Sequence, residues 1–332
     1  MTRAHKALLR GLLGLALLGA VLWLADPARV LGQLRQAQPG WLLAGLAAAI
    51  ASNIVSALRW RALARWLGAD MGVREASRWY FQAIGLNALL PGAVLGGDVY
   101  RAVVLQRAGQ DTLASSWSVV LDRVSGLWML CAIGGLGAAA CAPQLAPVLR
   151  LPTGAFAALM LAGTAAWLLL PLALPWLLRR GGTHGEEASD SRRMEGHRPA
   201  LLRRIGAWLA PLRGAVERPD FIAQLLQQAA ASAAVQLLSA AALAAGGLAL
   251  GVHIGWAAWA FAIAPVFLMA ALPASVGGWG TREAAAVAAL APLGVPAAAA
   301  VGTGVIYGLY QLVQGAMGAL AFGLPRSRRQ VG

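Results

Sequence analysis

Two arginines in apolar surroundings are the residues of this chain best suited to binding chemistry. Arg101 and Arg282 each lie four residues after a Gly-Gly pair that follows a Leu-Pro step. An arginine at helix-centre depth in a membrane costs at least about 2.5–3.5 kcal/mol, so it needs a partner or a polar cavity. Its guanidinium can grip a phosphate through a bidentate fork. The pair therefore predicts an anion-binding site, with purely structural ion pairs as the alternative.

The motif that carries these arginines occurs twice, in residues 90–101 and 272–283. Proline and glycine interrupt helices, and non-helical backbone survives at membrane depth only when it is buried or lines a cavity. Interrupted segments at matching places in two halves point to a transporter's binding site. A short helix that restarts after each glycine pair would also offer free N–H groups to an anion. The glycines concerned are Gly96, Gly97, Gly277 and Gly278.

Three acidic residues near these arginines could complete the site. Asp98, Asp122 and Glu283 could pair with the arginines, contact a cationic headgroup or carry a proton. The structural alternative pairs Arg101 with Asp98, and Arg282 with Glu283 or Asp122. Neighbouring helical residues point in different directions, so the pair formed by residues 282 and 283 is the less expected one.

The remaining candidates are polar side chains in apolar segments. Arg123 could join the site beside Asp122, or both could reach the cytoplasmic boundary by snorkelling. Tyr307 and Gln311 share one helix face and could line the same cavity, with helix packing as the alternative. Asn87 could bind substrate, although such residues more often form interhelical hydrogen bonds.

The composition identifies an integral membrane protein. Hydrophobic residues make up 59% of the 332 residues, and charged residues only 12%. The net charge of +14 comes from 26 Arg and one Lys, but their placement argues against a nucleic-acid partner. Cys131 and Cys141 provide no disulfide framework or metal-ligand spacing. No catalytic or nucleotide-binding motif occurs, so we expect neither an enzyme nor a cofactor.

Apolar runs predict six full transmembrane helices. They are residues 7–25, 40–58, 113–141, 151–178, 221–250 and 297–323. The basic, Trp-rich residues 59–79 suit an interfacial segment with Arg and Trp at headgroup level. With both termini in the cytoplasm, 20 of the 27 basic residues lie inside and three outside, as the positive-inside rule requires. We therefore expect a bacterial-type cytoplasmic (inner) membrane protein.

The two motifs then lie in re-entrant helical hairpins. The whole chain 1–332 forms one polytopic, all-α membrane domain. Its first half, about 1–178, contains the hairpin 79–107, and its second half, about 221–325, contains the hairpin 255–291. The basic residues 179–220 between the halves form a cytoplasmic loop with an interfacial helix. Six spans require the hairpins to enter from opposite faces, which is the geometry of an inverted-topology repeat.

Several motifs together carry a family resemblance. They are Leu58-Arg59-Trp60, Asn87-Ala88-Leu89-Leu90-Pro91, Gly96-Gly97-Asp98-x-x-Arg101, Leu121-Asp122-Arg123 and Pro273 with Gly277-Gly278-x-Gly280-x-Arg282-Glu283. Over nearly its whole length the chain resembles the membrane, flippase-like domain of lysylphosphatidylglycerol synthetases and its stand-alone relatives. The family pattern usually has Glu where Asp122 stands, a conservative departure. These residues contain no counterpart of the soluble aminoacyl-transferase domain, so the resemblance implies movement of a lipid rather than lysyl transfer.

The leading hypothesis is therefore a lipid flippase or scramblase-like transporter. A polar headgroup, with a phosphate as the expected feature, would bind in a midplane cavity while the acyl chains stay in the bilayer. One alternative is a membrane-embedded enzyme on a lipid-linked substrate, with Asp98, Asp122 or Glu283 as base. The other is a non-catalytic partner of a lipid-modifying transferase. A lipid-modifying enzyme or a second copy of the chain could be a protein partner.

Overall fold

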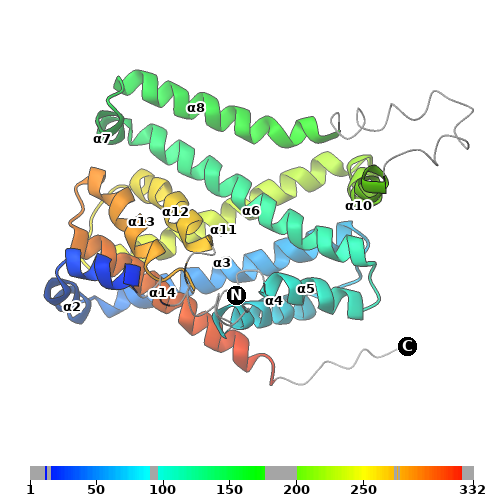
Figure 1. The fold of residues 1–332 in the computed structure, drawn as a ribbon, viewed down its shortest axis with the longest axis horizontal. Coiled ribbons are helices and arrows are strands. Elements are labelled where there is room, and N and C mark those ends of the chain that lie inside the picture. The colour runs from blue at the N-terminus through cyan, green and yellow to red at the C-terminus, as the bar shows by residue number, and fades with distance from the viewer. Residues whose placement is uncertain are drawn as a thin grey trace, which may run out of the picture.

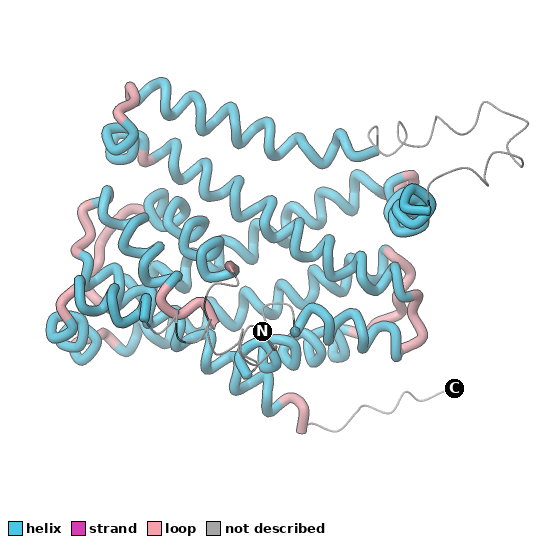
Figure 2. The backbone as a smooth tube through the Cα atoms, viewed as in Figure 1, coloured by secondary structure: helices cyan, strands magenta, loops and turns pink. Residues whose placement is uncertain are grey.

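Every regular element in the described part of the chain is a helix (Figure 2). The computed structural model describes residue 12 and residues 16–89, 96–175, 200–272, 275 and 277–323. The proline steps of both motifs and half of the polar loop predicted at 179–220, residues 179–199, therefore lie outside the described residues. The predicted all-α fold class is confirmed for the rest.

Among the described residues, four helices are long and apolar enough to cross a membrane, and they match four of the predicted spans. They are α3 (Pro39–Trp66), α6 (Thr112–Ala140), α8 (Thr153–Leu169) with its continuation η3 (Leu170–Ala173), and α11 (Phe221–Ala249). A 29-residue helix such as α11 reaches about 44 Å, well beyond a hydrocarbon core of about 30 Å. The chain is thus a multi-pass membrane protein.

The first predicted span is described only in part. Its residues 16–24 are helical, and α2 (Pro27–Arg35) follows at an angle of 86°. Asp26 makes this bend with a φ of 63°, and its carboxylate accepts hydrogen bonds from the first N–H groups of α2. The bent pair would count as a fifth span.

The last predicted span forms α14 (Ala297–Leu320), but its composition is too polar to pass the same test. Two tyrosines and two glutamines between residues 307 and 314 lower its hydropathy. The six-span count therefore stays a prediction. The polar side chains of α14 face other helices, as described below.

Each predicted hairpin forms as two short helices. The first consists of α4 (Val73–Leu89) and α5 (Gly96–Arg107), and the second of α12 (Trp256–Ala271) and α13 (Thr281–Leu290). The longest of them, α4, has 17 residues and reaches only about 26 Å, less than the hydrocarbon core. The hairpins lie toward opposite ends of the long helices (Figure 1).

The long helices α3 and α11 pack along each other in the middle of the molecule, and each hairpin leans on a helix from the other half of the chain. Thus α4 packs on α14, and α12 packs on α6. Glycines permit both close approaches. A Cβ added at Gly318 would lie 2.6 Å from the backbone N of Gly85 in α4, and one at Gly137 would lie 2.8 Å from the carbonyl O of Ala257 in α12.

Short elements complete the bundle. A turn of helix, α7 (Ala142–Leu145), and η2 (Ala146–Leu149) join α6 to α8, and η5 (Ala291–Leu293) leads into α14. The helix predicted in the basic loop forms α10 (Ala200–Val216). Its Trp208 stacks against Trp117 of α6 with ring centroids 4.3 Å apart, and the Trp117 indole N–H donates to the carbonyl O of Trp208, with N and O 2.6 Å apart. Its position on a membrane surface stays a prediction.

Candidate functional site

A carboxylate in the middle of α6 organises the first cluster of charged residues. Asp122 is only 1% exposed, and it lies between two arginines from other helices. Arg59 of α3 places Nη2 2.9 Å from Oδ1, and Arg101 of α5 places Nη1 2.7 Å from Oδ2. Arg59 also donates to the carbonyl O of Asp122. Because a charge buried among apolar helices is costly, each of the three ions depends on the others.

Arg101 has further partners that fit its burial. Its Nη2 lies 2.8 Å from Oδ1 of Asp98, one turn earlier on α5. The guanidinium carbon lies 5.2 Å from the ring centroid of Trp60 and 4.9 Å from that of Tyr80. A guanidinium over aromatic faces gains cation–π attraction, which is strongest where water is excluded. The predicted pairing of Arg101 with Asp98 is therefore present, but Asp122 is a second partner.

The outer edge of this cluster is accessible. Arg123 is 53% exposed in its side chain, and it binds Asp98 in a bidentate manner, with Nε 2.9 Å from Oδ2 and Nη2 2.8 Å from Oδ1. On the inner side, Nη1 of Arg59 donates to the hydroxyl of Ser232 on α11. We call these five charged residues the first cluster: Arg59, Asp98, Arg101, Asp122 and Arg123.

The first cluster carries an excess of positive charge. It contains three arginines, and within the described residues their ion pairs involve only two aspartates. One positive charge is therefore not balanced by a side chain of the cluster. A partly accessible arginine group with this balance suits an anion such as a phosphate, which arginine binds through two parallel hydrogen bonds.

The second hairpin holds a separate group, which we call the second cluster: Trp279, Arg282, Glu283 and Gln311. Arg282 and Glu283 are 1% and 0% exposed, and Nε of the arginine lies 3.1 Å from Oε1 of the glutamate. The arginine also donates from Nη1 to Oε1 of Gln311 on α14, 2.7 Å away, and its guanidinium carbon lies 4.9 Å from the ring centroid of Trp279.

One donor of the second cluster has no partner. Nη2 of Arg282 is buried without a hydrogen bond, next to Gly308 of α14, where an added Cβ would approach it to 2.7 Å. The glycine thus makes room for the guanidinium against the helix. A buried charged donor without an acceptor is rare in proteins, so a water or an anion could satisfy it.

The pairing of Arg282 corrects the sequence analysis. The adjacent residues 282 and 283 do form the ion pair that was the less expected one, because long side chains can bend toward each other even when their Cβ atoms diverge. The alternative pair with Asp122 does not form, since Arg59 and Arg101 take both oxygens of that carboxylate. Nor do the hydrogen bonds of the described residues connect the two clusters into the single cavity that was predicted.

The glycines of the first hairpin play a packing role. Gly96 and Gly97 start α5 in helical conformation, and the N–H of Gly97 donates to Oδ1 of Asn87 over 2.7 Å. An added Cβ at Gly97 would lie 2.5 Å from the carbonyl O of Ala83 in α4. Asn87 therefore closes the hairpin, and it takes an N–H group that was predicted to bind an anion.

The glycines of the second hairpin serve the backbone turn. Gly277 and Gly278 have φ values of 61° and 76°, and Gly280 has 84°, a region that only glycine adopts without strain. The N–H of Gly280 donates to Oε2 of Glu283 over 2.6 Å, which caps α13. Here too, the glutamate of the chain itself occupies part of the predicted anion site at the helix N-terminus.

The polar residues predicted to form a stripe on α14 have two different roles, one in the second cluster and one in helix packing. Gln311 belongs to the second cluster, whereas Tyr307 is buried with its ring centroid 5.0 Å from that of Phe267. Gln314 hydrogen-bonds to Asn53 of α3 and to the carbonyl O of Tyr310. Of the two predicted stripe residues, Gln311 thus hydrogen-bonds to a candidate arginine, and Tyr307 packs against Phe267.

Arg59 is the site residue that the sequence analysis missed. It was assigned to an interfacial segment, but α3 continues to Trp66, and Arg59 and Trp60 are both buried. Arg59 can be buried because it pairs with Asp122, which stabilises a charge that would otherwise have to reach the headgroups. Its place in the motif Leu58-Arg59-Trp60, together with an embedded aspartate that needed a cation, was the available signal.

The described residues contain no group of three or more His, Cys, Asp or Glu side chains that could hold a metal ion. The chemistry available in the two clusters is therefore that of guanidinium and carboxylate groups. All three candidate carboxylates are paired to arginines.

Comparison with known proteins agrees with this architecture. Residues 11–318 match the family described as the lysylphosphatidylglycerol synthase TM region. A "UPF0104 membrane protein" of Methanothermobacter thermautotrophicus is 26% identical over 120 residues. That match spans 36% of this chain and 36% of the archaeal protein. Since the family match covers most of the chain, including both clusters, the protein belongs to the family of the lysylphosphatidylglycerol synthase TM region.

Proposed function

We propose that this protein moves a lipid with an anionic headgroup between membrane leaflets. The observation that carries the proposal is the unbalanced positive charge of the first cluster, which is buried among helices but accessible at Arg123. A lipid phosphate at this edge could replace or share the bidentate contacts that Asp98 now makes. The unpartnered Nη2 of Arg282 offers a second place for an anionic group. The family membership is consistent with a lipid-related role.

Exchange between the leaflets would come from an inverted-topology repeat. The hairpins lie toward opposite ends of the long helices, and each packs on a helix of the other half of the chain (Figure 1). A twofold relation in the membrane plane would exchange these two pairs of contacts. Rocking of one half against the other would then expose the arginines to each leaflet in turn.

The charge distribution supports an orientation with both termini in the cytoplasm, in a bacterial-type inner membrane. In this orientation the first hairpin and α10 lie at the cytoplasmic end. The arginine-rich end would also attract anionic lipids.

A catalytic role is less well supported. A general base needs a carboxylate that is free to take a proton. Both oxygens of Asp122 accept from arginines, and those of Glu283 accept from Arg282 and from the N–H of Gly280. These partners occupy the carboxylate oxygens and restrict the access of a substrate to them.

The test is a leaflet-accessibility assay with purified protein in liposomes. Fluorescent phospholipids with anionic, zwitterionic and cationic heads are compared in wild type, Arg123→Gln and Arg29→Gln. We expect the anionic probe to equilibrate fastest. Arg123→Gln should slow it about tenfold or more, since a hydrogen bond to a charged group contributes about 1.5–3 kcal/mol. Arg29, which is 80% exposed and lies on α2, provides the matched loss of charge and should leave the rate unchanged.

Three results would contradict the proposal. Probes that move no faster than in protein-free vesicles would exclude transport of these lipids. A transport rate of Arg123→Gln equal to that of wild type would contradict the assignment of the first cluster as the headgroup site. A changed mass of the recovered lipid would indicate an enzyme. A partner of a transferase would instead be more sensitive to deletion of residues 181–196 than to loss of Arg123.

A further inference from the structure

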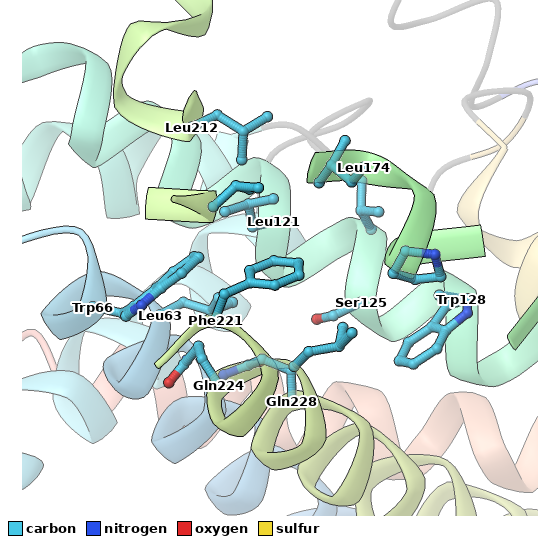
Figure 3. A pocket seen from close by; sticks show the side chains of 14 residues that line it. Leu63, Trp66, Leu121, Ser125, Trp128, Leu174, Leu212, Phe221, Gln224 and Gln228 are labelled. Carbon is cyan, nitrogen blue, oxygen red and sulfur yellow. The ribbon is translucent and has the colours of Figure 1, made fainter. Parts of the chain in front are cut away.

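A cleft with apolar walls adjoins the first cluster but has a different chemical character. It lies between α3, α6, α10, α11 and the end of α8, and holds about 650 Å³ of space, part of it open to the outside. Its walls include Leu63, Leu121, Trp128, Leu174, Leu212 and Phe221 (Figure 3).

The polar side chains in the lining are Ser125 of α6 and two amides of α11. Gln224 and Gln228 lie one turn apart beneath Phe221 (Figure 3). Gln228 is only 4% exposed, yet neither its amide N nor its amide O has a hydrogen-bond partner, and Nε2 of Gln224 has none either. Buried amides are almost always satisfied in proteins. Two unsatisfied amides in one cleft therefore indicate a ligand with polar atoms at this level.

The position of the two amides along α11 indicates how deep the polar atoms of such a ligand would lie in the bilayer. When α11 is centred on the midplane, its 29 residues extend about 7 Å beyond each side of a hydrocarbon core of about 30 Å. Gln224 then lies about 4.5 Å and Gln228 about 10.5 Å from the start of the helix. The two amides thus lie on either side of the boundary between headgroups and hydrocarbon, where the ester groups of glycerolipids are found.

We propose that this cleft binds one acyl chain of a diacyl glycerolipid, whose ester carbonyl accepts hydrogen bonds from the amides of Gln224 and Gln228. The apolar walls match the chain, and the two NH₂ groups match an acceptor at its head end. The cleft is linked to the first cluster through Ser125, which lines it and donates to the carbonyl O of Asp122 over 3.1 Å. Only the identification of this lipid as the transported one rests on the proposed function.

Photo-crosslinking tests the site without relying on transport. Purified full-length protein in detergent micelles without other ester lipid is titrated with phosphatidylglycerol that carries a diazirine on one acyl chain, and labelled peptides are mapped. We expect saturable labelling of the α6 and α11 residues that line the cleft. The double variant Gln224→Leu/Gln228→Leu should lower this labelling about tenfold, which corresponds to about 1.4 kcal/mol.

Gln227→Leu provides the matched control, because Gln227 is exposed on the same helix and does not line the cleft. It should keep wild-type labelling. The double variant should also keep or raise the thermal midpoint in detergent, because leucine removes amides that are buried without partners. A fold defect and a binding defect are therefore distinguishable.

Other outcomes would overturn the inference. Labelling spread over the outer helix faces without enrichment in the cleft would exclude the site. Equal labelling of the double variant would exclude the role of the amides. A polyprenyl phosphate has no carboxylic ester, so competition by it that is as effective as competition by unlabelled diacyl lipid would exclude recognition of the ester carbonyl. Labelling of the cleft without lipid exchange between leaflets would contradict the proposed function and leave this inference intact. Lipid exchange without labelling of the cleft would contradict this inference and leave the proposed function intact.

Discussion

The two arginine clusters come from the same sequence motif but solve the problem of a buried charge differently. In the first cluster, Arg101 is held by Asp122 on another helix, and that carboxylate also holds Arg59 on a third. In the second cluster, Arg282 is held mainly by its own neighbour Glu283, with a single neutral contact to α14. The first cluster ties α3, α5 and α6 together, whereas the second belongs largely to its own hairpin.

The two clusters also differ in their solvent exposure and in their net charge. The first has an accessible edge at Arg123 and an unbalanced positive charge, whereas the ion pair of the second is fully buried and neutral, although its Gln311 is exposed. Two matching motifs therefore do not imply two matching sites. We infer that the first cluster is the main place where a headgroup is bound, and that the second also positions the hairpin on α14.

The largest loss of stability should follow Asp122→Asn. The substitution keeps the size of the side chain but leaves two buried arginines without their shared anion. Breaking a buried ion pair by removing one partner costs about 3–5 kcal/mol. The thermal midpoint in detergent should fall accordingly, and Asp122→Glu should recover most of the loss because it retains a carboxylate.

Asp98→Asn is the comparison for this prediction. Asp98 is more exposed than Asp122, and one of its partners, Arg123, can be solvated. We therefore expect a smaller loss. A midpoint for Asp122→Asn that is no lower than that of Asp98→Asn would show that the central carboxylate is not the organising residue.

The second cluster should respond to a double substitution in a way that the first cannot. Glu283→Gln leaves Arg282 buried without a counter-ion and should cost about 3 kcal/mol. Adding Arg282→Gln removes the stranded charge and should recover much of that loss. In the first cluster, Asp122→Asn with Arg101→Gln still leaves Arg59 unpaired. The thermal midpoints of both double variants are compared with those of the single variants. Equal recovery in the two clusters would contradict the idea that pairing is local in the second cluster and shared among three helices in the first.

The sequence was sufficient to predict the helices that carry the two clusters, but not the pairing inside the clusters or the contrast between them. Hydropathy, the helix-breaking residues and the repeated motif predicted the long helices and the two hairpins, because these depend on local composition. The partner of Arg282 was misjudged, since adjacent residues seemed unable to pair. Arg59 was missed because burial of a charge depends on Asp122, which is 63 residues away.

The packing of α4 on α14 and that of α12 on α6 should be more alike than the two arginine clusters are. Gly318→Ala would press a methyl group against the backbone of α4, and Gly137→Ala would press one against the backbone of α12. Overpacking of this kind costs about 1–3 kcal/mol. If the repeat is real, both variants should lower the thermal midpoint by similar amounts.

Gly163→Ala is the control for these substitutions. It lies on α8, and an added Cβ there has no other atom within 4 Å. Since alanine favours a helix over glycine by about 0.5–1 kcal/mol, this variant should be as stable as wild type or slightly more so. A large effect at one interface and none at the other would speak against equivalent packing of the hairpins.

The smallest effect on stability should come from Arg123→Gln, the variant with the largest expected effect on transport. Its side chain is 53% exposed, so its ion pair with Asp98 contributes about 1 kcal/mol or less. Arg101 would still hold Asp98 from the inner side. The thermal midpoint should therefore stay close to wild type. A midpoint as low as that of Asp122→Asn would mean that Arg123 is part of the buried scaffold, and its loss could then no longer separate headgroup binding from folding.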